Sequence, residues 1–251
     1  MTFKNIRIIP SLLLKKDRFV KGKYFQNHID AGDPVKTCVA HNSQFADELI
    51  IVDLDAYEKN LYPNITLLEK IISEINTPVA FGGNINNLEI AEKIIRSGAD
   101  KLLINSNLSN EKLIKNISLM FGRQAIVACI DLIRIEDEYK VYLRGKILKD
   151  SFMEYFKSIL KKEIGEIKIT FVNLEGSRKG IDIDFAKKLL SISDVPIIFE
   201  GGLSNLSDIE KTISAGIESI ALGTMLVFSD NNIFKIKQFL QNRNIPVRLR
   251  D

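Results

Sequence analysis

The sequence contains no tryptophan, and it has only two cysteines, six prolines and two histidines among 251 residues. Two cysteines, Cys38 and Cys129, cannot build the disulfide framework of a small secreted protein, so we expect free thiols in a reducing, cytoplasmic compartment. The histidines, His28 and His41, are too few for a histidine-based metal site or catalytic triad. We therefore expect no metal and no cofactor, and we place both histidines outside the active site.

Long apolar runs are also missing. No stretch approaches the length of a membrane span, and Arg7 interrupts a short apolar run near the start that lacks a signal-peptide cleavage pattern. We therefore expect no membrane association. The formal net charge is +3, and the lysines and arginines are dispersed among acidic residues, which argues against a nucleic-acid-binding surface.

An internal repeat is present. Residues 78–88 align without a gap against residues 196–206, at an offset of 118 residues. The same offset pairs Asp131 with Leu13, so one half ends its first strand in a carboxylate and the other half ends it in a hydrocarbon. The repeat is too long for a solenoid or propeller unit, so each half must be a half-domain.

Short β-branched runs alternate with segments of helical apolar spacing, as in βα units around a parallel sheet. No Gly/Pro/Ser-rich linker separates the halves. The sequence therefore predicts an α/β fold with a single (β/α)8 TIM barrel over residues 1–251 and half-barrels of approximately 1–122 and 123–251. The eight predicted strands are Ile6–Ser11, Leu49–Asp53, Pro78–Phe81, Lys101–Ile104, Ala125–Asp131, Ile167–Phe171, Pro196–Phe199 and Ser219–Leu222.

Two segments depart from plain βα alternation. Residues 14–36 are predicted to form a long polar loop after the first strand, and residues 132–146 are predicted to form a β-hairpin around Glu136. Both follow strands at the barrel end that carries the active sites of this architecture. Both are long enough to act as lids.

Glycine pairs follow two predicted strands, at Gly82–Gly83 and Gly201–Gly202. Without side chains there, backbone N–H groups can approach an anion at the start of the following helix, although tight βα turns would also explain the glycines. Asn105–Ser106 and Gly223–Thr224 end the next strand in each half, which predicts two equivalent pockets. Two such pockets at one barrel mouth suit a phosphorylated small-molecule ligand with a phosphate at each end.

Polar side chains at the ends of predicted strands are expected to point into the barrel mouth. Asp131 is the best candidate for a catalytic acid or base because it closes an otherwise apolar strand, where desolvation can tune its pKa. The alternative is that it caps the next turn. Lys21, on the first loop, is either a catalytic clamp on a phosphate or reacting carbonyl or a solvated loop lysine. The full set of strand-end residues is Asp53, Asp55, Asn105, Asp131, Asn173 and Glu175.

The opposite end of the barrel is charged as well, because four strand beginnings carry Arg7, Glu48, Lys101 and Glu166. Strand beginnings are often charged, so simple exposure to solvent is one explanation. If the four side chains point inward, they form a ring of alternating sign that plugs the barrel floor. Such a ring must be paired to offset its desolvation.

Several motifs taken together are similar to one family in order and spacing. The chain resembles the cyclase subunit of imidazole glycerol phosphate synthase, the HisF family, along essentially its whole length. The motifs are Lys21-Gly-x-x-Phe25-x-Asn27, Gly32-Asp-Pro, Val52-Asp-Leu-Asp-Ala56, Phe81-Gly-Gly, the run from Gly98 to Asn105, Asp131, Gly201–Gly202 and the terminal Val247-Arg-Leu.

That resemblance implies a barrel that receives ammonia from a separate HisH-like glutaminase subunit, as a heterodimer, and conducts it to the mouth. It implies an ammonia gate formed by the four charged strand-beginning residues and a glutaminase-facing position at Asp100. It places phosphate sites at Gly83 and Ser106 in one half and at Gly176, Gly202 and Thr224 in the other. Nearby, the chain departs from the family at Asn84, Glu175 and Glu200, which puts the ligand in doubt.

The largest departure is Leu13, which stands where the family carries the first of two catalytic aspartates. Loss of a general acid or base typically lowers a rate by about 10²–10⁴-fold. In this respect the chain is similar to HisF-like paralogues associated with glycosyl amidation, the WbuZ type. Those supply ammonia to a third protein, a sugar amidotransferase of bacterial surface polysaccharide (lipopolysaccharide) biosynthesis.

Three functions therefore remain open. The first is an ammonia-conducting subunit for sugar amidation. The second is an authentic cyclase of histidine biosynthesis, with Asp131 as the main acid or base. The third is a sugar-phosphate isomerase, which the run Val52-Asp-Leu-Asp suggests but which the charged floor and Leu13 oppose.

Overall fold

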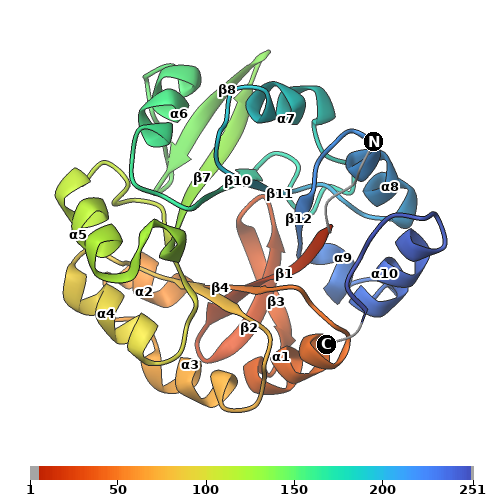
Figure 1. The fold of residues 1–251 in the computed structure, drawn as a ribbon, viewed down its shortest axis with the longest axis horizontal. Helices are drawn as coiled ribbons and strands as arrows, with labels where there is room; N and C mark the ends of the chain where they lie inside the picture. The colour runs from red at the N-terminus through yellow and green to blue at the C-terminus, as the bar shows by residue number, and fades with distance from the viewer. Residues whose placement is uncertain (1–5, 250–251) are drawn as a thin grey trace.

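The computed structural model describes residues 6–249, so the first five residues of the apolar start lie outside it. Eight parallel strands form a closed barrel, because each pairs with the next around the ring and the last pairs with the first. Figure 1 shows the helices arranged around the outside of this barrel. The predicted TIM barrel and its eight strands are confirmed, and the half-barrel boundaries stay a prediction. The barrel strands are β1 (Arg7–Lys15), β4 (Leu49–Asp53), β5 (Val79–Gly82), β6 (Lys101–Ile104), β7 (Ile126–Ile135), β10 (Glu166–Phe171), β11 (Ile197–Glu200) and β12 (Ser219–Leu222).

The outer helices form where apolar residues recur at helical spacing, and each lays its apolar stripe on the sheet. Asparagine side chains begin several of them: Asn87 accepts a hydrogen bond from Ile90 N at 2.9 Å, and Asn205 does the same for Asp208 N at 2.9 Å. These two caps are related by the internal repeat. The helices are α1 (Pro34–Ser43), α2 (Leu54–Lys59), α3 (Ile65–Ile72), α4 (Leu88–Arg96), α5 (Glu111–Phe121), α6 (Phe152–Leu160), α7 (Ile183–Leu190), α8 (Leu206–Ser214), α9 (Thr224–Val227) and α10 (Ile233–Gln241), with a 3₁₀ turn at Arg123–Ala125.

Apolar side chains form a large cluster between sheet and helices and a small one inside the barrel. The small cluster includes Ile9, Ile50 and Leu103. Because side chains alternate along a strand, every second residue of β1 points inward, from Arg7 at the floor through Ile9 to Leu13 at the mouth. The barrel interior is therefore charged at the floor, largely apolar above it except for the buried pair of Lys168 and Glu200, and open at the mouth.

The first segment after β1 differs from the predicted polar loop. It folds as two antiparallel strands, β2 (Arg18–Lys23) and β3 (Gln26–Gly32), with β2 paired to the extended end of β1. The turns place four non-glycine residues in the left-handed region, at Lys16–Asp17 and Tyr24–Phe25. Such turns normally carry Asn-Gly or Asp-Gly, and neither pair stands here, so these residues did not indicate a hairpin.

The second segment that departs from βα alternation, residues 132–146, is the predicted hairpin. β7 turns at Glu136–Asp137 into β8 (Glu138–Leu143), and a short β9 (Lys146–Ile147) follows. The prediction for residues 132–146 is confirmed. The hairpin brings the turn before β9, which contains Arg144, back to the barrel mouth.

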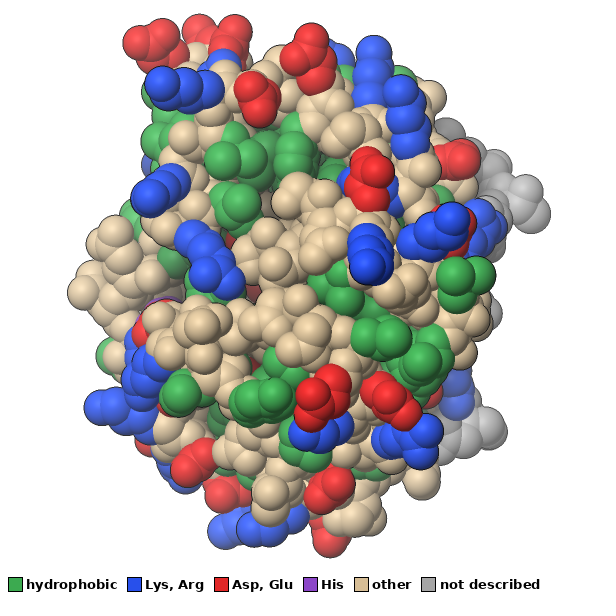
Figure 2. All heavy atoms as spheres, turned by 90° about the vertical axis from the view of Figure 1, so that its left-hand side faces the viewer, with side chains coloured by type: hydrophobic (Ala, Val, Ile, Leu, Met, Phe, Trp, Pro, Cys, Tyr) green, Lys and Arg blue, Asp and Glu red, His purple; other side chains and the backbone are tan. Residues whose placement is uncertain are grey.

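The surface agrees with the balanced composition. Figure 2 shows one flank of the barrel, on which basic and acidic side chains lie interspersed with apolar ones. Within residues 6–249, no helix is long and apolar enough to cross a membrane.

Candidate functional site

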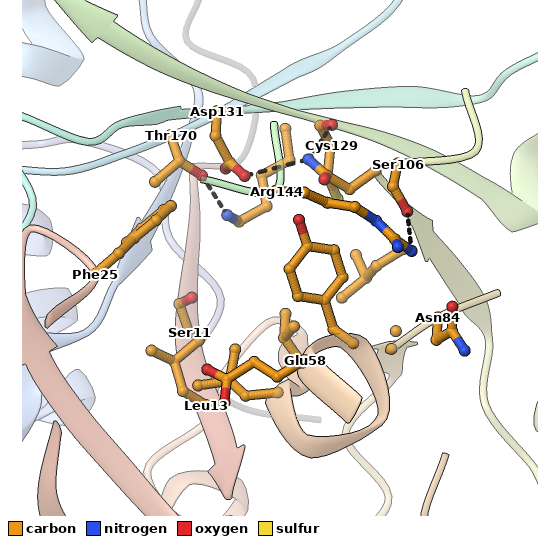
Figure 3. Close-up of a pocket in the computed structure, with 18 of the residues that line it drawn as sticks. Ser11, Leu13, Phe25, Glu58, Asn84, Ser106, Cys129, Asp131, Arg144 and Thr170 are labelled. Carbon is orange, nitrogen blue, oxygen red and sulfur yellow. Dashed lines mark hydrogen bonds between the residues drawn. The ribbon is translucent and has the colours of Figure 1, made fainter. Parts of the chain in front are cut away.

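A cavity of about 480 Å³ opens at the barrel mouth, at the carboxyl ends of the strands, where TIM barrels carry their active sites. Figure 3 shows side chains from opposite sides of the barrel converging on it, with Asp131 and Thr170 on one side and Leu13 on the other. The β2–β3 segment and the β7–β8 hairpin also line the cavity, through Lys21 and Arg144.

Asp131 lies at the centre of the polar side of this cavity. It accepts a hydrogen bond from Asn105 Nδ2 at 3.2 Å and is bonded to the Thr170 hydroxyl. Burial, opposed by the positive charge of Lys168, raises the pKa of Asp131 to about 6. A carboxyl with this pKa exchanges protons near neutral pH, as a general acid or base must. Its hydrogen bonds run to side chains at the mouth ends of the neighbouring strands β6 and β10 rather than to a following turn, which disfavours the capping alternative.

Asp131→Asn is expected to stabilise the protein at pH 8 by about 1–3 kcal/mol, and by no more than about a third of that amount at pH 4.5. The folded state holds the proton of Asp131 more tightly than the unfolded chain, because its pKa is raised. Stability contributed by this group is therefore lost as pH rises from about 4 to about 6, and asparagine escapes that loss.

Urea unfolding of both proteins at the two pH values measures the effect. The exposed Asp194 provides the control, since Asp194→Asn should change stability little at either pH. Equal effects of Asp131→Asn at pH 4.5 and pH 8 would show that burial does not raise the pKa of Asp131.

Leu13 lines the cavity from β1, opposite Asp131, as the internal repeat predicts (Figure 3). Its neighbour across the sheet on β4 is Val52, so the two strands present apolar side chains to the mouth here. Glu58 lies near Leu13 in Figure 3, and its carboxylate pairs with Lys15 at 2.7 Å. The sequence did not indicate Glu58, because it sits on a helix and not at a strand end.

Lys21 is buried, and its Nζ forms an ion pair with Glu175 Oε1 at 2.6 Å. It is therefore not a solvated loop lysine. A second buried ion pair joins Lys168 to Glu200, and Lys168 also donates to Thr170 Oγ1 at 2.6 Å. Sequence reasoning missed Lys168, although strand alternation places it on the same inward face of β10 as Glu166.

The predicted phosphate-binding residues divide into two groups. Gly83, Asn105 and Ser106 line the cavity. The other four do not line it, and the glycines among them support close packing instead: a Cβ at Gly202 would lie 1.9 Å from the carbonyl oxygen of Gly180. The four residues outside the cavity are Gly176, Gly202, Gly223 and Thr224.

Three strand-end residues predicted to point into the mouth do not line the cavity, so that prediction was wrong for them. Asp53 caps α2 and accepts from Ala56 N at 3.0 Å and Asn64 N at 2.9 Å. Asp55 pairs with Lys59 at 2.8 Å, and Asn173 bonds the backbone of Arg134. Each of these side chains satisfies backbone or helix partners, a use that the sequence pattern cannot separate from a catalytic one.

One of the two histidines lines the cavity and the other does not. His28 lines the cavity, because β3 folds back over the mouth, so its predicted position outside the site was wrong. His41 is buried in α1 away from the cavity, as predicted, and burial lowers its pKa to about 4. Cys38 and Cys129 are free, as expected. Among the described residues, no cluster of three or more histidine, cysteine or acidic side chains could hold a metal ion.

At the opposite end, Arg7, Glu48, Lys101 and Glu166 form a closed ring, which we call the floor ring. Glu48 lies 3.3 Å from Arg7 and 2.6 Å from Lys101. Glu166 lies 2.9 Å from Lys101 and is also paired with Arg7. All four side chains point inward, so the predicted ring is present. Both carboxylates are buried, which pairing with two cations makes tolerable.

Asp100 lies beside the floor ring, where its exposed carboxylate accepts a hydrogen bond from Val79 N at 2.8 Å. It therefore holds the beginning of β5 and remains open to solvent at the barrel floor. A partner docked at this end would meet Asp100 and, just inside it, the floor ring.

Comparison with known proteins gives a consistent result. The family model described as "Histidine biosynthesis protein" matches residues 7–232. The chain is 33% identical to imidazole glycerol phosphate synthase subunit HisF of Exiguobacterium sibiricum, over 96% of this chain and 98% of the relative. It is 34% identical to the subunit of the same name from Alkaliphilus metalliredigens, with the same coverage. It is 35% identical to a protein of Campylobacter jejuni provisionally named imidazole glycerol phosphate synthase subunit hisF2, over 97% and 98%.

Proposed function

The chain belongs to the family of imidazole glycerol phosphate synthase subunit HisF, and we propose that it is the ammonia-conducting barrel subunit of a glutamine amidotransferase complex. A HisH-like glutaminase would dock at the barrel floor and release ammonia there. The ammonia would pass the floor ring and the apolar barrel interior to an acceptor bound at the mouth. The relatives are named as synthase subunits, which supports a partner of this kind.

The observation that carries the proposal is the contrast between the two ends of the barrel. The floor ring is complete, with every carboxylate paired. The mouth has Asp131 on one side and Leu13 on the other, so it lacks the second carboxylate that the resemblance assigns to the cyclase reaction. A barrel with a complete floor ring but without both catalytic carboxylates at its mouth fits a subunit that supplies ammonia for another reaction.

We further propose that this reaction is amidation of a sugar for a surface polysaccharide, in the cytoplasm, with a sugar amidotransferase as a third protein. The alternative is an authentic cyclase of histidine biosynthesis, which converts phosphoribulosyl-formimino-AICAR phosphate and ammonia to imidazole glycerol phosphate and AICAR. Asp131, with its pKa of about 6, favours the alternative, because one poised acid or base is present. Leu13 opposes it.

The proposal is tested by mixing the purified protein with a HisH-type glutaminase and measuring glutamine hydrolysis. Coupling between the subunits is expected to raise hydrolysis by about tenfold or more. Asp100→Asn should weaken association, because it removes the exposed charge while keeping an oxygen for the bond to Val79 N. The control is Glu89→Gln on α4, which alters only an exposed pair with Lys93. A protein that neither binds nor stimulates the glutaminase would contradict the proposal.

A further inference from the structure

The charged side chains that line the mouth are mostly neutralised by one another. Lys21 pairs with Glu175, and Lys168 pairs with Glu200, and all four side chains are no more than 7% exposed. A buried pair of this kind resists exchange with a ligand, because separating it leaves an uncompensated charge in a poorly solvated place. These four residues add no net charge to the cavity.

Both ion pairs lie on the side of the mouth formed by β10, β11 and β12, where the repeat predicts one of the two phosphate pockets. The ammonium of Lys21 lies against Gly223, where a Cβ would be only 2.4 Å from Nζ. Gly202 packs against the carbonyl of Gly180. A phosphate entering this half would meet the carboxylates of Glu175 and Glu200, whose balancing cations are already engaged.

The side of the mouth around Gly83 and Ser106 is different, because it holds a cation that is not neutralised. Arg144 donates to Ser106 Oγ at 3.2 Å and lies over the Tyr57 ring at 5.1 Å. Its side chain is exposed, and among residues 6–249 no carboxylate lies within ion-pair distance of its guanidinium. Figure 3 shows Arg144 reaching across the cavity toward Ser106, with Asn84 on the same side. Gly83 lines the cavity beside Asn84 with φ of +146°, a conformation that favours glycine.

We propose that the mouth binds a ligand with a single phosphate, a phosphate monoester held by Arg144, Ser106 and the backbone around Gly83, and that its other end is uncharged. Guanidinium and hydroxyl donors suit a phosphate group, and an uncharged, hydroxyl-bearing end suits the side of the mouth where both lysines are already paired with carboxylates. This inference deepens the proposed function, since the ligand would be the ammonia acceptor or a part of it. It excludes a bisphosphate from the mouth of the native protein.

The test follows backbone amide signals by NMR while inorganic phosphate, ribose 5-phosphate or ribose 1,5-bisphosphate is added to the full-length protein. One saturable site is expected, with shifts at Gly83, Asn84 and Ser106 and none at Gly202 or Thr224. Arg144→Gln should weaken binding of inorganic phosphate and ribose 5-phosphate by at least about tenfold, and Arg144→Lys should lose less. The control is Lys140→Gln on the same hairpin, where the lysine pairs with Glu138 and does not line the cavity.

A second variant asks whether the ion pair closes the other half. Lys168→Leu and Glu200→Ser are introduced together, so that neither buried charge is left alone. The hydroxyl of Thr224, which is buried without a hydrogen-bond partner among the described residues, is the donor expected to meet a phosphate in this variant. This double variant should gain affinity for ribose 1,5-bisphosphate relative to ribose 5-phosphate, with new shifts at Thr224.

Two outcomes would overturn the inference: a second phosphate site at Gly202 and Thr224 in the native protein, or no saturable phosphate binding at Arg144. Native-like spectra of each variant exclude misfolding as the cause of lost binding. No glutaminase is present in these titrations, so their failure is distinct from failure of the proposed ammonia transfer.

Discussion

Glu166→Gln is expected to lower the free energy of unfolding by about 2–4 kcal/mol, because it breaks the floor ring at a buried position. Glu166 contacts both cations of the ring, Arg7 and Lys101, and is itself only 5% exposed. Without its charge, two cations share the single carboxylate of Glu48. The two cations are about a quarter exposed, at 27% and 22%, so water relieves part of the loss and keeps the effect below that of a fully buried pair.

Urea unfolding measured by circular dichroism checks this value. Glu58→Gln is the matched control, since it removes an ion pair with Lys15 that is 27% and 42% exposed, and such pairs contribute less than about 1 kcal/mol. Adding Lys101→Met to Glu166→Gln should recover part of the lost stability, because it removes one of the two unbalanced cations. If Glu166→Gln and Glu58→Gln are equally mild, the floor ring does not depend on its charge balance.

The sequence allowed prediction of the barrel because its strands and helices differ in apolar period, and because the repeat fixed the two halves at the same offset. It also allowed prediction of the floor ring. Four charged residues at strand beginnings share one end of a parallel barrel, and strand alternation then turns them to the same side. Both inferences depend on local pattern plus one geometric rule, which is why they transferred to the structure without change.

The mouth was less accessible to the same reasoning. Asp131 and Asn105 were located correctly because they stand at the mouth end of barrel strands, but Asp53 ends a barrel strand too and caps a helix instead. Arg144 and His28 enter the cavity from excursions that fold back over the barrel. Their positions depend on turn geometry and strand pairing, which composition and spacing do not report.

The two halves of the barrel have the same scaffold and different chemistry at equivalent places. On the side around Gly83 and Ser106, the mouth has an exposed cation, Arg144, supplied by the hairpin of the second half-barrel, and an apolar residue, Leu13. The second half offers a poised carboxylate and two buried ion pairs around Glu175 and Glu200. A ligand bound here would therefore be oriented by a single charged end, with Asp131 positioned to exchange a proton with its uncharged part. This asymmetry defines how cyclase activity should respond to mutation.

With excess ammonium salt and no glutaminase, the native protein is expected to convert phosphoribulosyl-formimino-AICAR phosphate about 10²–10⁴-fold more slowly than an authentic cyclase of the family. Leu13 stands in place of one of the two groups that the resemblance assigns to proton transfer. The buried ion pair of Lys168 and Glu200 also disfavours binding of the second phosphate of this substrate. Turnover at the level of an authentic cyclase would show that Leu13 is compensated, and the histidine pathway would then be the function of this chain.

Leu13→Asp separates the two causes of low turnover. If the missing carboxylate were the only defect, this substitution would recover most of the 10²–10⁴-fold loss. We expect it to recover less than about tenfold, because the bisphosphate must still enter a half-mouth held closed by the pair of Lys168 and Glu200. Adding Lys168→Leu and Glu200→Ser to Leu13→Asp should then raise turnover well beyond either change alone. Full recovery by Leu13→Asp alone would instead mean that the ion pair yields to a second phosphate, and the single-phosphate inference would be wrong even though the floor ring and its partner remained as proposed.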